Sequence, residues 1–327
     1  MLKHYYEFKA KNNYDLGLQL GHAFKKEALE RIRRYQKQSF WSKRMSASLP
    51  LLHASKKIFP QYIDELRGYA KTAGINFFEF WTISLEDELD WIEHCTSVIT
   101  NRGRLVAHNE DFDKGTENSM CLIKKTIGDL TILELFYYNT LGGNSASINS
   151  HGVIQLVNTL KQTDSQIGVP KNIIGRWMSE SRDPSADFQK LKTIKRSSGY
   201  NFIYVKNNFG VINIECTAKH QMLSVPRLPY AHTNHYITKL KKYERYIGKS
   251  SYQRYAFAKK HVKKNIGVFD MMEVMNDSTI GFDESVMNEN TIGKIVFDLE
   301  KSNIYVWLLR EATKGFVKFD VKKIFTI

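Results

Sequence analysis

The sequence predicts a layered α+β sandwich in which helices cover mainly antiparallel sheets. Residues up to position 94 carry apolar side chains at helical spacing, short strand-like runs begin at Cys95, and later blocks of strands are separated by pairs of helices. The 327 residues can bury a large core, and their 42% hydrophobic and 25% charged content is near the average for globular proteins. We therefore expect one folded domain and no repeat architecture.

Helices are predicted for most of the first 94 residues. Between Tyr14 and Tyr35, apolar residues recur every three or four positions and charged residues fill the gaps, which indicates one amphipathic helix. A second helical pattern begins near Pro60, and a third begins at Asn76, a good cap with Glu79 three residues on. We expect residues 1–94 to form a mostly helical segment that belongs to the same fold as the rest.

A β-rich region follows this segment. Residues 101–104 form a short polar turn between two apolar runs, which is typical of a β-hairpin. Further strands are predicted at residues 120–123, 131–138, 146–148, 153–157, 201–205, 211–215, 294–299, 304–309 and 315–319.

Helices and one special turn interrupt these strands. A helix is predicted at residues 173–178, and another from Pro184 to about Lys195, because Asp183 is a good cap and proline suits the first turn. The pair Gly142-Gly143 indicates a tight turn that needs a positive φ, and we treat it as structural.

The formal net charge of +14 would permit binding to nucleic acid, an anionic membrane or an acidic substrate. The densest basic stretch, residues 239–264, interleaves lysines and arginines with tyrosines. Such a stretch is either the solvated face of one or two helices or a nucleic-acid site, and we favour the helices because no nucleic-acid motif accompanies it.

The N-terminus lacks the apolar core of a secretory signal, and no stretch approaches the ~20 apolar residues of a membrane span. We expect a cytoplasmic protein that makes no membrane contact. Its three cysteines, Cys95, Cys121 and Cys216, are an odd number without metal-like spacing, so reduced thiols are expected and neither a disulfide nor a metal site is predicted. We interpret Cys121 and Cys216 as small buried hydrophobic residues.

A series of short motifs occurs in a characteristic order. It comprises residues 13–21, Cys95-Thr96-Ser97, residues 108–112, Gly142-Gly143-Asn144, residues 149–152, Val157-Asn158, residues 232–235, residues 250–254 and Thr291-Ile292-Gly293. Together these motifs resemble the acyl-coenzyme A:6-aminopenicillanic acid acyltransferase family, which are cysteine members of the N-terminal nucleophile (Ntn) hydrolases, and more distantly the choloylglycine hydrolases. The resemblance implies a four-layer αββα sandwich.

The resemblance further implies a precursor that cuts its own chain between His94 and Cys95. Residues 1–94 would then be a small chain that stays packed on the catalytic segment, residues 95–327. A freed Cys95 carries a thiol and an α-amine whose reference pKa of ~7.7 to 8.0 suits it as the base. The thiolate would attack an amide carbonyl and leave an acyl-thioester for water or a second amine to resolve.

The resemblance assigns four further residues to the site. Asp111 would orient the amine or thiol of Cys95, although it also suits an ordinary turn carboxylate. Asn158 ends an apolar strand and would donate to the oxyanion, or would cap a loop. Asn234 would be a second polar support of the cysteine. Arg254 would pair with the catalytic carboxylate or hold a substrate carboxylate.

Three histidines bear on the alternatives. His232 and His235 flank Asn234, and we interpret them as loop histidines, since no carboxylate or cysteine near them in sequence completes a metal site. His108 stands where choloylglycine hydrolases have an arginine, which argues against a bile-salt substrate.

The leading hypothesis is a cysteine amidohydrolase or acyltransferase that acts on a small-molecule amide or acyl donor. We predict no cofactor, and a homo-oligomer is compatible with the sequence. The alternative is an unprocessed, non-catalytic protein of the same fold that binds an anionic ligand through its basic surface, prompted by His94, where the family has a small or acidic residue, and by the net charge of +14.

Overall fold

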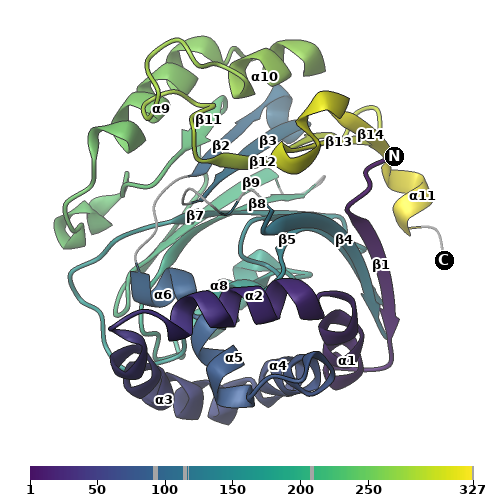
Figure 1. Ribbon diagram of the computed structural model, residues 1–327. Helices are drawn as coiled ribbons and strands as arrows, with labels where there is room; N and C mark the ends of the chain where they lie inside the picture. The colour runs from purple at the N-terminus through teal and green to yellow at the C-terminus, as the bar shows by residue number, and fades with distance from the viewer. Residues whose placement is uncertain (91–94, 113–115, 117, 207–209, 326–327) are drawn as a thin grey trace.

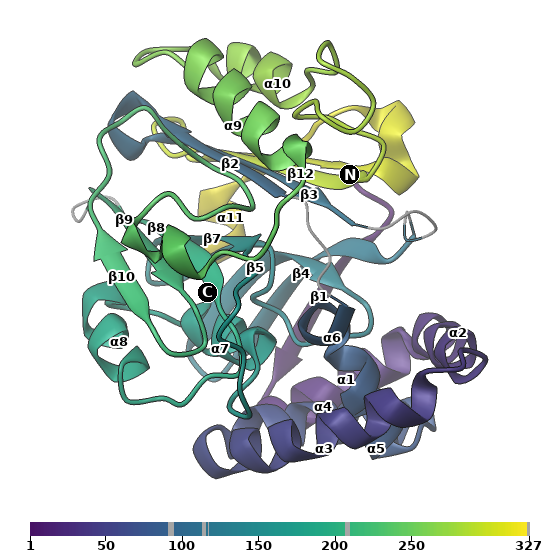
Figure 2. The same cartoon turned by 90° about the vertical axis from the view of Figure 1, so that its left-hand side faces the viewer.

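The computed structural model describes residues 1–90, 95–112, 116, 118–206 and 210–325. Two sheets stack face to face, and helices cover the outer face of each, as Figure 1 shows and the rotated view of Figure 2 confirms. One hydrophobic cluster fills the space between the sheets, and separate clusters lie under each helical layer. The predicted four-layer αββα arrangement is confirmed.

The first sheet has eight strands in the order β1-β4-β5-β6-β7-β8-β9-β10. Their bounds are β1 Tyr5–Ala10, β4 Met120–Ile127, β5 Leu130–Tyr137, β6 Ala146–Asn149, β7 Val153–Thr159, β8 Tyr200–Lys206, β9 Gly210–Cys216 and β10 Gln221–Ser224. All neighbours are antiparallel except β1, which pairs with β4 in parallel. The sequence patterns did not predict β1, so the mostly helical segment also supplies one strand of the sheet.

The second sheet has six antiparallel strands in the order β11-β2-β3-β12-β13-β14. Their bounds are β2 Cys95–Thr100, β3 Leu105–Asp111, β11 Tyr230–His232, β12 Thr291–Asp298, β13 Asn303–Leu308 and β14 Val317–Asp320. The predicted hairpin is therefore confirmed as β2 and β3, joined by the short 3-10 turn η1 (Asn101–Gly103).

Helices of the N-terminal segment and of the middle of the chain pack on the eight-stranded sheet. They are α1 Asn13–Ala23, α2 Lys25–Gln36, α3 Trp41–Ile58, α4 Pro60–Ala73, α5 Phe77–Ser84, α6 Glu86–Asp90, α7 Lys171–Met178 and α8 Pro184–Leu191. On the six-stranded sheet lie α9 Lys249–His261 and α10 Val268–Met275, and the remaining short elements are η2 Lys239–Tyr243, η3 Leu309–Lys314 and α11 Val321–Phe325.

Local sequence signals explain several helix boundaries. Pro60 begins α4, and the Asn76 side chain caps α5 by accepting from two backbone N–H groups, as predicted. The single helix predicted from Tyr14 to Tyr35 is wrong, because the chain leaves helical geometry at Phe24, with φ −114° and ψ 21°. The Phe24 ring is fully buried in an aromatic cluster. Tertiary packing therefore ends α1 at Phe24, although the apolar periodicity of the sequence continues past this residue.

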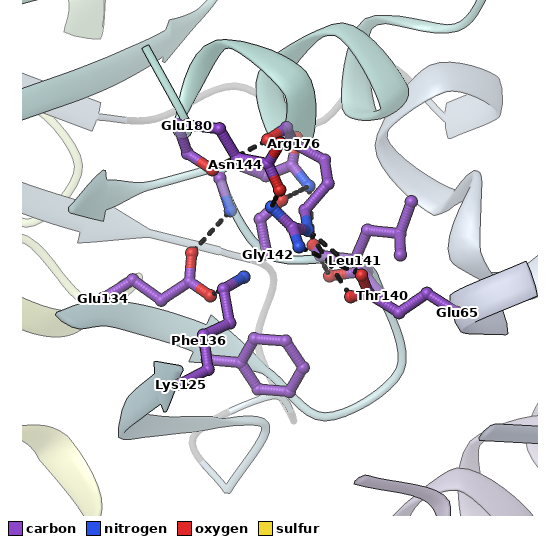
Figure 3. Close-up of polar contacts among 12 residues, drawn as sticks. Glu65, Lys125, Glu134, Phe136, Thr140, Leu141, Gly142, Asn144, Arg176 and Glu180 are labelled. Atoms are coloured by element: carbon purple, nitrogen blue, oxygen red, sulfur yellow. Dashed lines mark hydrogen bonds and ion pairs between the residues drawn. The ribbon is translucent and has the colours of Figure 1, made fainter. Parts of the chain in front are cut away.

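The Gly142-Gly143 turn lies in a buried charged environment (Figure 3). Gly143 has the predicted positive φ, +81°, and its N–H donates to Glu134 Oε2 at 2.6 Å. Gly142 has no positive φ, but a Cβ there would lie 2.0 Å from Glu134 Oε1 and 2.4 Å from Lys125 Nζ. The turn therefore needs glycine at position 142 for lack of space and glycine at position 143 for the positive φ. It also sets the position of the adjacent Asn144.

No helix within the described ranges is long and apolar enough to cross a membrane.

Candidate active site

Cys95 begins β2 and is buried, with 4% of its surface exposed. Its backbone N–H donates to Asn234 Oδ1 at 2.9 Å. Burial, helped by the carboxylates of Glu110 and Asp111, raises the pKa of its thiol well above the usual value, although the backbone N–H of Asp111 and the charge of Arg254 act in the opposite direction. In the uncut chain the thiol is therefore protonated, and a base must remove its proton before it can attack.

Strand alternation decides what the thiol faces. Residues at every second position of β2 point to one face of the sheet, so Cys95 and Ser97 point with Ile99 into the core between the two sheets. The intervening Thr96 points with Val98 to the side covered by α9. The candidate nucleophile therefore lies between the sheets, whereas its neighbour Thr96 faces the helical layer.

Arg254, on α9, is fully buried and holds the chain at this point. Its Nη1 donates to the Cys95 carbonyl at 2.7 Å and to Thr96 Oγ1 at 2.9 Å, and its Nη2 donates to Asn234 Oδ1 at 2.8 Å. Neither Arg254 nor Asn158 is among the residues that line the cavity at Cys95, so the predicted role of Arg254 in holding a substrate carboxylate stays a prediction. Its charge does act on the carboxylate, since burial raises the pKa of Asp111 and Arg254 opposes that rise.

Asn234 is shared between these groups. Its Oδ1 accepts from the Cys95 N–H and from Arg254, and its Nδ2 donates to the Thr159 carbonyl at 3.1 Å. These three partners belong to different segments, so this one amide ties β2, β7 and α9 together.

Asp111 ends β3 and is 2% exposed. Its Oδ2 accepts from Asn288 Nδ2 at 3.0 Å, whereas its Oδ1 has no hydrogen-bond partner in the described chain. Burial raises the pKa of this carboxyl group, and Arg254, Thr291 and Asn288 counteract the rise. The free oxygen is available for a group at Cys95.

Asn158 reaches the site from the other sheet. It lies on β7, fully buried, and its Oδ1 accepts from Ser97 Oγ at 3.0 Å and from Asn201 Nδ2 at 3.3 Å. With its oxygen on these two partners, the remaining Nδ2 has no partner among the described residues. An unpaired buried N–H donor is costly in a resting protein and is what an oxyanion hole requires.

Sequence reasoning missed a polar chain beside the cysteine. Ser97 Oγ contacts His108 Nδ1 at 2.9 Å, and His108 Nε2 contacts Glu110 Oε2 at 2.8 Å. Glu110 also accepts from Tyr137 and Ser145. The signal was present in the hairpin, because antiparallel pairing places Cys95 opposite Glu110 and Ser97 opposite His108.

Cys95, His108 and Glu110 each offer a ligand atom within 4.8 Å of the others, the arrangement closest to a metal site in the described ranges. Both ring nitrogens of His108 are engaged by Ser97 and Glu110, so the geometry fits proton transfer better than metal binding.

The two other histidines are held by side chains far away in sequence. His232 Nε2 contacts Glu215 Oε1 at 3.0 Å. His235 Nδ1 contacts Ser251 Oγ at 2.8 Å, and burial lowers the pKa of this ring to about 3, so it is neutral. Their ring nitrogens serve hydrogen bonds that fix the loop around Asn234.

A small cavity of about 40 Å³ opens at Cys95. Its wall combines the ends of β3 and β5, helix α6 and the loop after Gly143, and it includes the carboxylates Glu86, Asp87, Glu110 and Asp111. His94 lies outside the described residues, so the predicted cleavage site has its second residue, Cys95, within the structure and its first beyond it.

Comparison with known proteins gives a family match. The sequence model described as acyl-coenzyme A:6-aminopenicillanic acid acyl-transferase matches residues 98–312, about two thirds of the chain, and so begins three residues after Cys95. A Beta-alanyl-dopamine/carcinine hydrolase of Drosophila melanogaster is 26% identical in an alignment 166 residues long that covers 43% of this chain and 43% of that protein. The match therefore spans less than half the length of this curated relative.

Two solved structures are similar at 10% identity. Penicillin V acylase from Agrobacterium tumefaciens has a TM-score of 0.49 over 70% of this chain and 87% of its own. A mutant conjugated bile acid hydrolase from Clostridium perfringens has a TM-score of 0.47 over 71% of this chain and 94% of its own.

Proposed function

The chain belongs to the acyl-coenzyme A:6-aminopenicillanic acid acyl-transferase family, and from this premise we propose that it is a cysteine amidohydrolase or acyltransferase whose nucleophile is Cys95. The observation that carries the proposal is the set of buried polar groups around Cys95 from separate segments: Asn234 and Arg254 bond its backbone, and the charge of Asp111 acts on its thiol. Asn158 bonds Ser97, two residues further along β2. A set of unrelated buried polar groups would not be expected to meet around a thiol by packing alone.

Autocatalytic cleavage between His94 and Cys95 is the first step of the proposal. Cys95 Sγ attacks the carbonyl carbon of His94, the S–C bond forms and the C–N bond breaks, and the nitrogen leaves as the α-amine of Cys95. Water then hydrolyses the thioester, leaving a carboxylate on His94 and a free thiol. The contact from the Cys95 nitrogen to Asn234 Oδ1, 2.9 Å, supports this step because the same oxygen would hold the new amine in place.

The freed amine then acts as the base in turnover. It takes the thiol proton, the thiolate attacks the substrate carbonyl, and the unpaired Asn158 Nδ2 donates to the negative oxygen that forms. The leaving amine takes the proton back, and water or a second amine releases the acyl group from Cys95. The free Oδ1 of Asp111 fits an acceptor for the ammonium form of the Cys95 amine.

Residues 1–94 stay part of the enzyme in this proposal. β1 is hydrogen-bonded to β4, and α1, α2, α4 and α5 contribute buried residues to the core under the eight-stranded sheet. The small and large fragments would therefore remain one particle after cleavage.

We propose a small-molecule amide as the substrate class, in line with the amides named for the Drosophila relative. Whether water or an amine is the final acceptor depends on what enters the cavity with the acyl-enzyme.

N-terminal sequencing and intact mass of the purified protein test the proposal together with activity on a panel of acyl amides. Wild type should yield a fragment that starts at Cys95, and Cys95→Ala should remain one chain without activity. Cys121→Ala is the matched control, since Cys121 is a fully buried thiol on β4 away from the site, and it should be cut and active. An uncut wild-type chain whose activity survives Cys95→Ala would refute the proposal.

The alternative, an uncut protein that binds an anion through its basic surface, has less support. Arg254, one residue of the basic stretch, is buried and serves Cys95, and the cavity at the site is acidic. Salt-dependent binding of a polyanion to the Cys95→Ala chain, without cleavage of wild type, would favour it.

A further inference from the structure

We propose that Glu110, supported by His108, is the base that takes the thiol proton of Cys95 when the chain cuts itself, so that the precursor and the mature enzyme use different bases. The inference rests on the proposed function, because it concerns the cleavage step before Cys95. The turnover mechanism makes no use of this buried pair.

The uncut chain needs a base other than the Cys95 nitrogen. Before cleavage this nitrogen belongs to a peptide bond, where resonance withdraws its lone pair, and its N–H donates to Asn234 Oδ1 at 2.9 Å. It can take a proton only after the cut has made it an amine. The thiol is meanwhile protonated, because burial and nearby carboxylates raise its pKa well above the usual value. A residue already in place must therefore accept the proton.

Glu110 is the carboxylate that faces the thiol. It lies opposite Cys95 in the antiparallel pair of β2 and β3, so the two side chains leave the same face of the sheet. The Cys95 sulfur, a Glu110 carboxylate oxygen and a His108 ring nitrogen all lie within 4.8 Å of one another. Cys95 and Glu110 also line the same cavity, whose volume of about 40 Å³ has room for a water between them. A general base needs this reach, either directly or through one water.

The contacts of Glu110 allow it to share a proton. Its Oε2 lies 2.8 Å from His108 Nε2, and His108 Nδ1 lies 2.9 Å from Ser97 Oγ. The hydroxyl groups of Tyr137 and Ser145 donate to the two oxygens of Glu110 and hold the carboxylate in place. No lysine or arginine among the described residues forms an ion pair with it, and such a partner would weaken it as a base. The accepted proton is therefore shared between the carboxylate and the His108 ring.

Asp111 is the other carboxylate near the thiol, and it suits this role less well. The charge of Glu110 raises the pKa of the thiol more than that of Asp111 does. Although burial raises the pKa of Asp111, its contacts with Arg254, Thr291 and Asn288 favour the ionised form and so oppose uptake of a proton. Glu110 therefore serves the cut, and Asp111 serves the amine that the cut releases.

One proton moves through the whole cleavage step. Glu110 takes it from the thiol, Cys95 Sγ bonds to the carbonyl carbon of His94, and the C–N bond of the tetrahedral intermediate breaks. The pair of Glu110 and His108 returns the proton to the leaving nitrogen, which becomes the Cys95 amine. Water then hydrolyses the thioester. From this point the amine is the base, because it is attached to the same residue as the thiol.

Cleavage during cell-free translation, followed by mass as the loss of full-length chain, measures the rate of the cut. Glu110→Gln keeps the size of the side chain and removes its basicity, so the cut should slow at least about 100-fold. Glu215→Gln is the matched control, because Glu215 is also fully buried and lies 3.0 Å from a histidine, His232, but does not line the cavity. Its rate should stay within about threefold of wild type. Similar slowing in both variants would overturn the proposal, because loss of any buried pair would then explain it.

Formate distinguishes lost basicity from lost structure. Glu110→Ala leaves space for a small carboxylate beside Cys95, so sodium formate should speed its cut at least tenfold, whereas sodium chloride at the same concentration should not. Thermal unfolding checks that the variant is folded. A folded Glu110→Ala chain that does not respond to formate would overturn the proposal.

Turnover separates this proposal from the proposed function. In the cut fraction of Glu110→Gln, kcat per N-terminal Cys95 should fall at least tenfold less than the cleavage rate does, because the amine is then the base. Equal losses in the two rates would contradict the use of two bases. A wild-type chain that is never cut would refute the proposed function and this proposal together. Wild type and Glu110→Gln cut at one rate would refute this proposal alone.

Discussion

Replacing Asn158 by leucine removes the donor that we assign to the oxyanion and keeps the volume of the side chain nearly constant. In the resting protein Nδ2 has no partner, so its loss breaks no existing hydrogen bond. Oδ1 loses two, of which the one from Asn201 is long, 3.3 Å, and the one from Ser97 can be replaced by the contact of Ser97 to His108. We expect the free energy of unfolding to fall by about 1–3 kcal/mol.

The catalytic cost should be larger than the structural one. Removing one oxyanion donor typically lowers kcat by roughly 10²- to 10³-fold, about 2.7–4 kcal/mol, because the donor acts on charge that develops only in the transition state. KM should change little for the same reason. Steady-state kinetics on the best substrate of the amide panel measure both quantities, and thermal unfolding checks that the variant is folded.

Asn213→Leu is the matched control for this variant. Asn213 is fully buried on β9 of the same sheet, and neither end of its amide has a partner in the described chain. The same substitution should there leave kcat within twofold and stability equal or higher, because it removes two unpaired polar atoms. A kcat for Asn158→Leu within tenfold of wild type would refute the assigned role.

Three further predictions concern stability. Arg254→Met should lower the free energy of unfolding by about 3–5 kcal/mol, measured by thermal unfolding, because it leaves buried acceptors around the cysteine unpaired; a loss below about 1 kcal/mol would contradict this. Gly142→Ala should cost about 1–3 kcal/mol, since its Cβ would lie 2.0 Å from Glu134, whereas Gly248→Ala, where a Cβ meets no atom within 4 Å, should be nearly neutral. Against the rise that burial causes, hydrogen bonds from the Lys314 side chain, from the backbone N–H groups of Lys3 and His4 and from the His4 ring lower the pKa of Glu311 from 4.5 to about 2. Its contribution to stability is therefore complete above pH 4.5 and disappears as the pH falls towards 2. Melting temperatures of Glu311→Gln should therefore fall less than those of wild type across that interval, and parallel curves would refute the assignment.

The order of strands and helices could largely be predicted because short apolar runs and caps are local signals. Pro60 and Asn76 mark helix starts that the structure has. The break at Phe24 could not be predicted, because it depends on the packing of that ring against strands more than a hundred residues away. The N-terminal strand β1 could not be predicted for a similar reason, since its partner β4 is distant in sequence.

The residues of the candidate site also divide into those that local motifs predict and those that only the folded structure shows. Cys95, Asn158 and Asn234 were recognisable from motifs, and the structure bonds Asn234 to Cys95 and Asn158 to Ser97 on the same strand. Glu110 and His108 were not, because their importance depends on which residues of two paired strands lie opposite each other. The acidic wall was also invisible, since Glu86 and Asp87 come from a short helix that approaches Cys95 only in the folded chain.

The parallel pairing of β1 with β4 has a consequence for the protein after the proposed cut. An intact chain refolds in a first-order process, because the N-terminal strand and helices are tethered to the sheet they complete. Once the bond before Cys95 is broken, two chains must meet in solution, and refolding becomes second-order and dependent on concentration. The mature enzyme would then depend on slow unfolding for its lifetime, while the precursor alone could recover from denaturation.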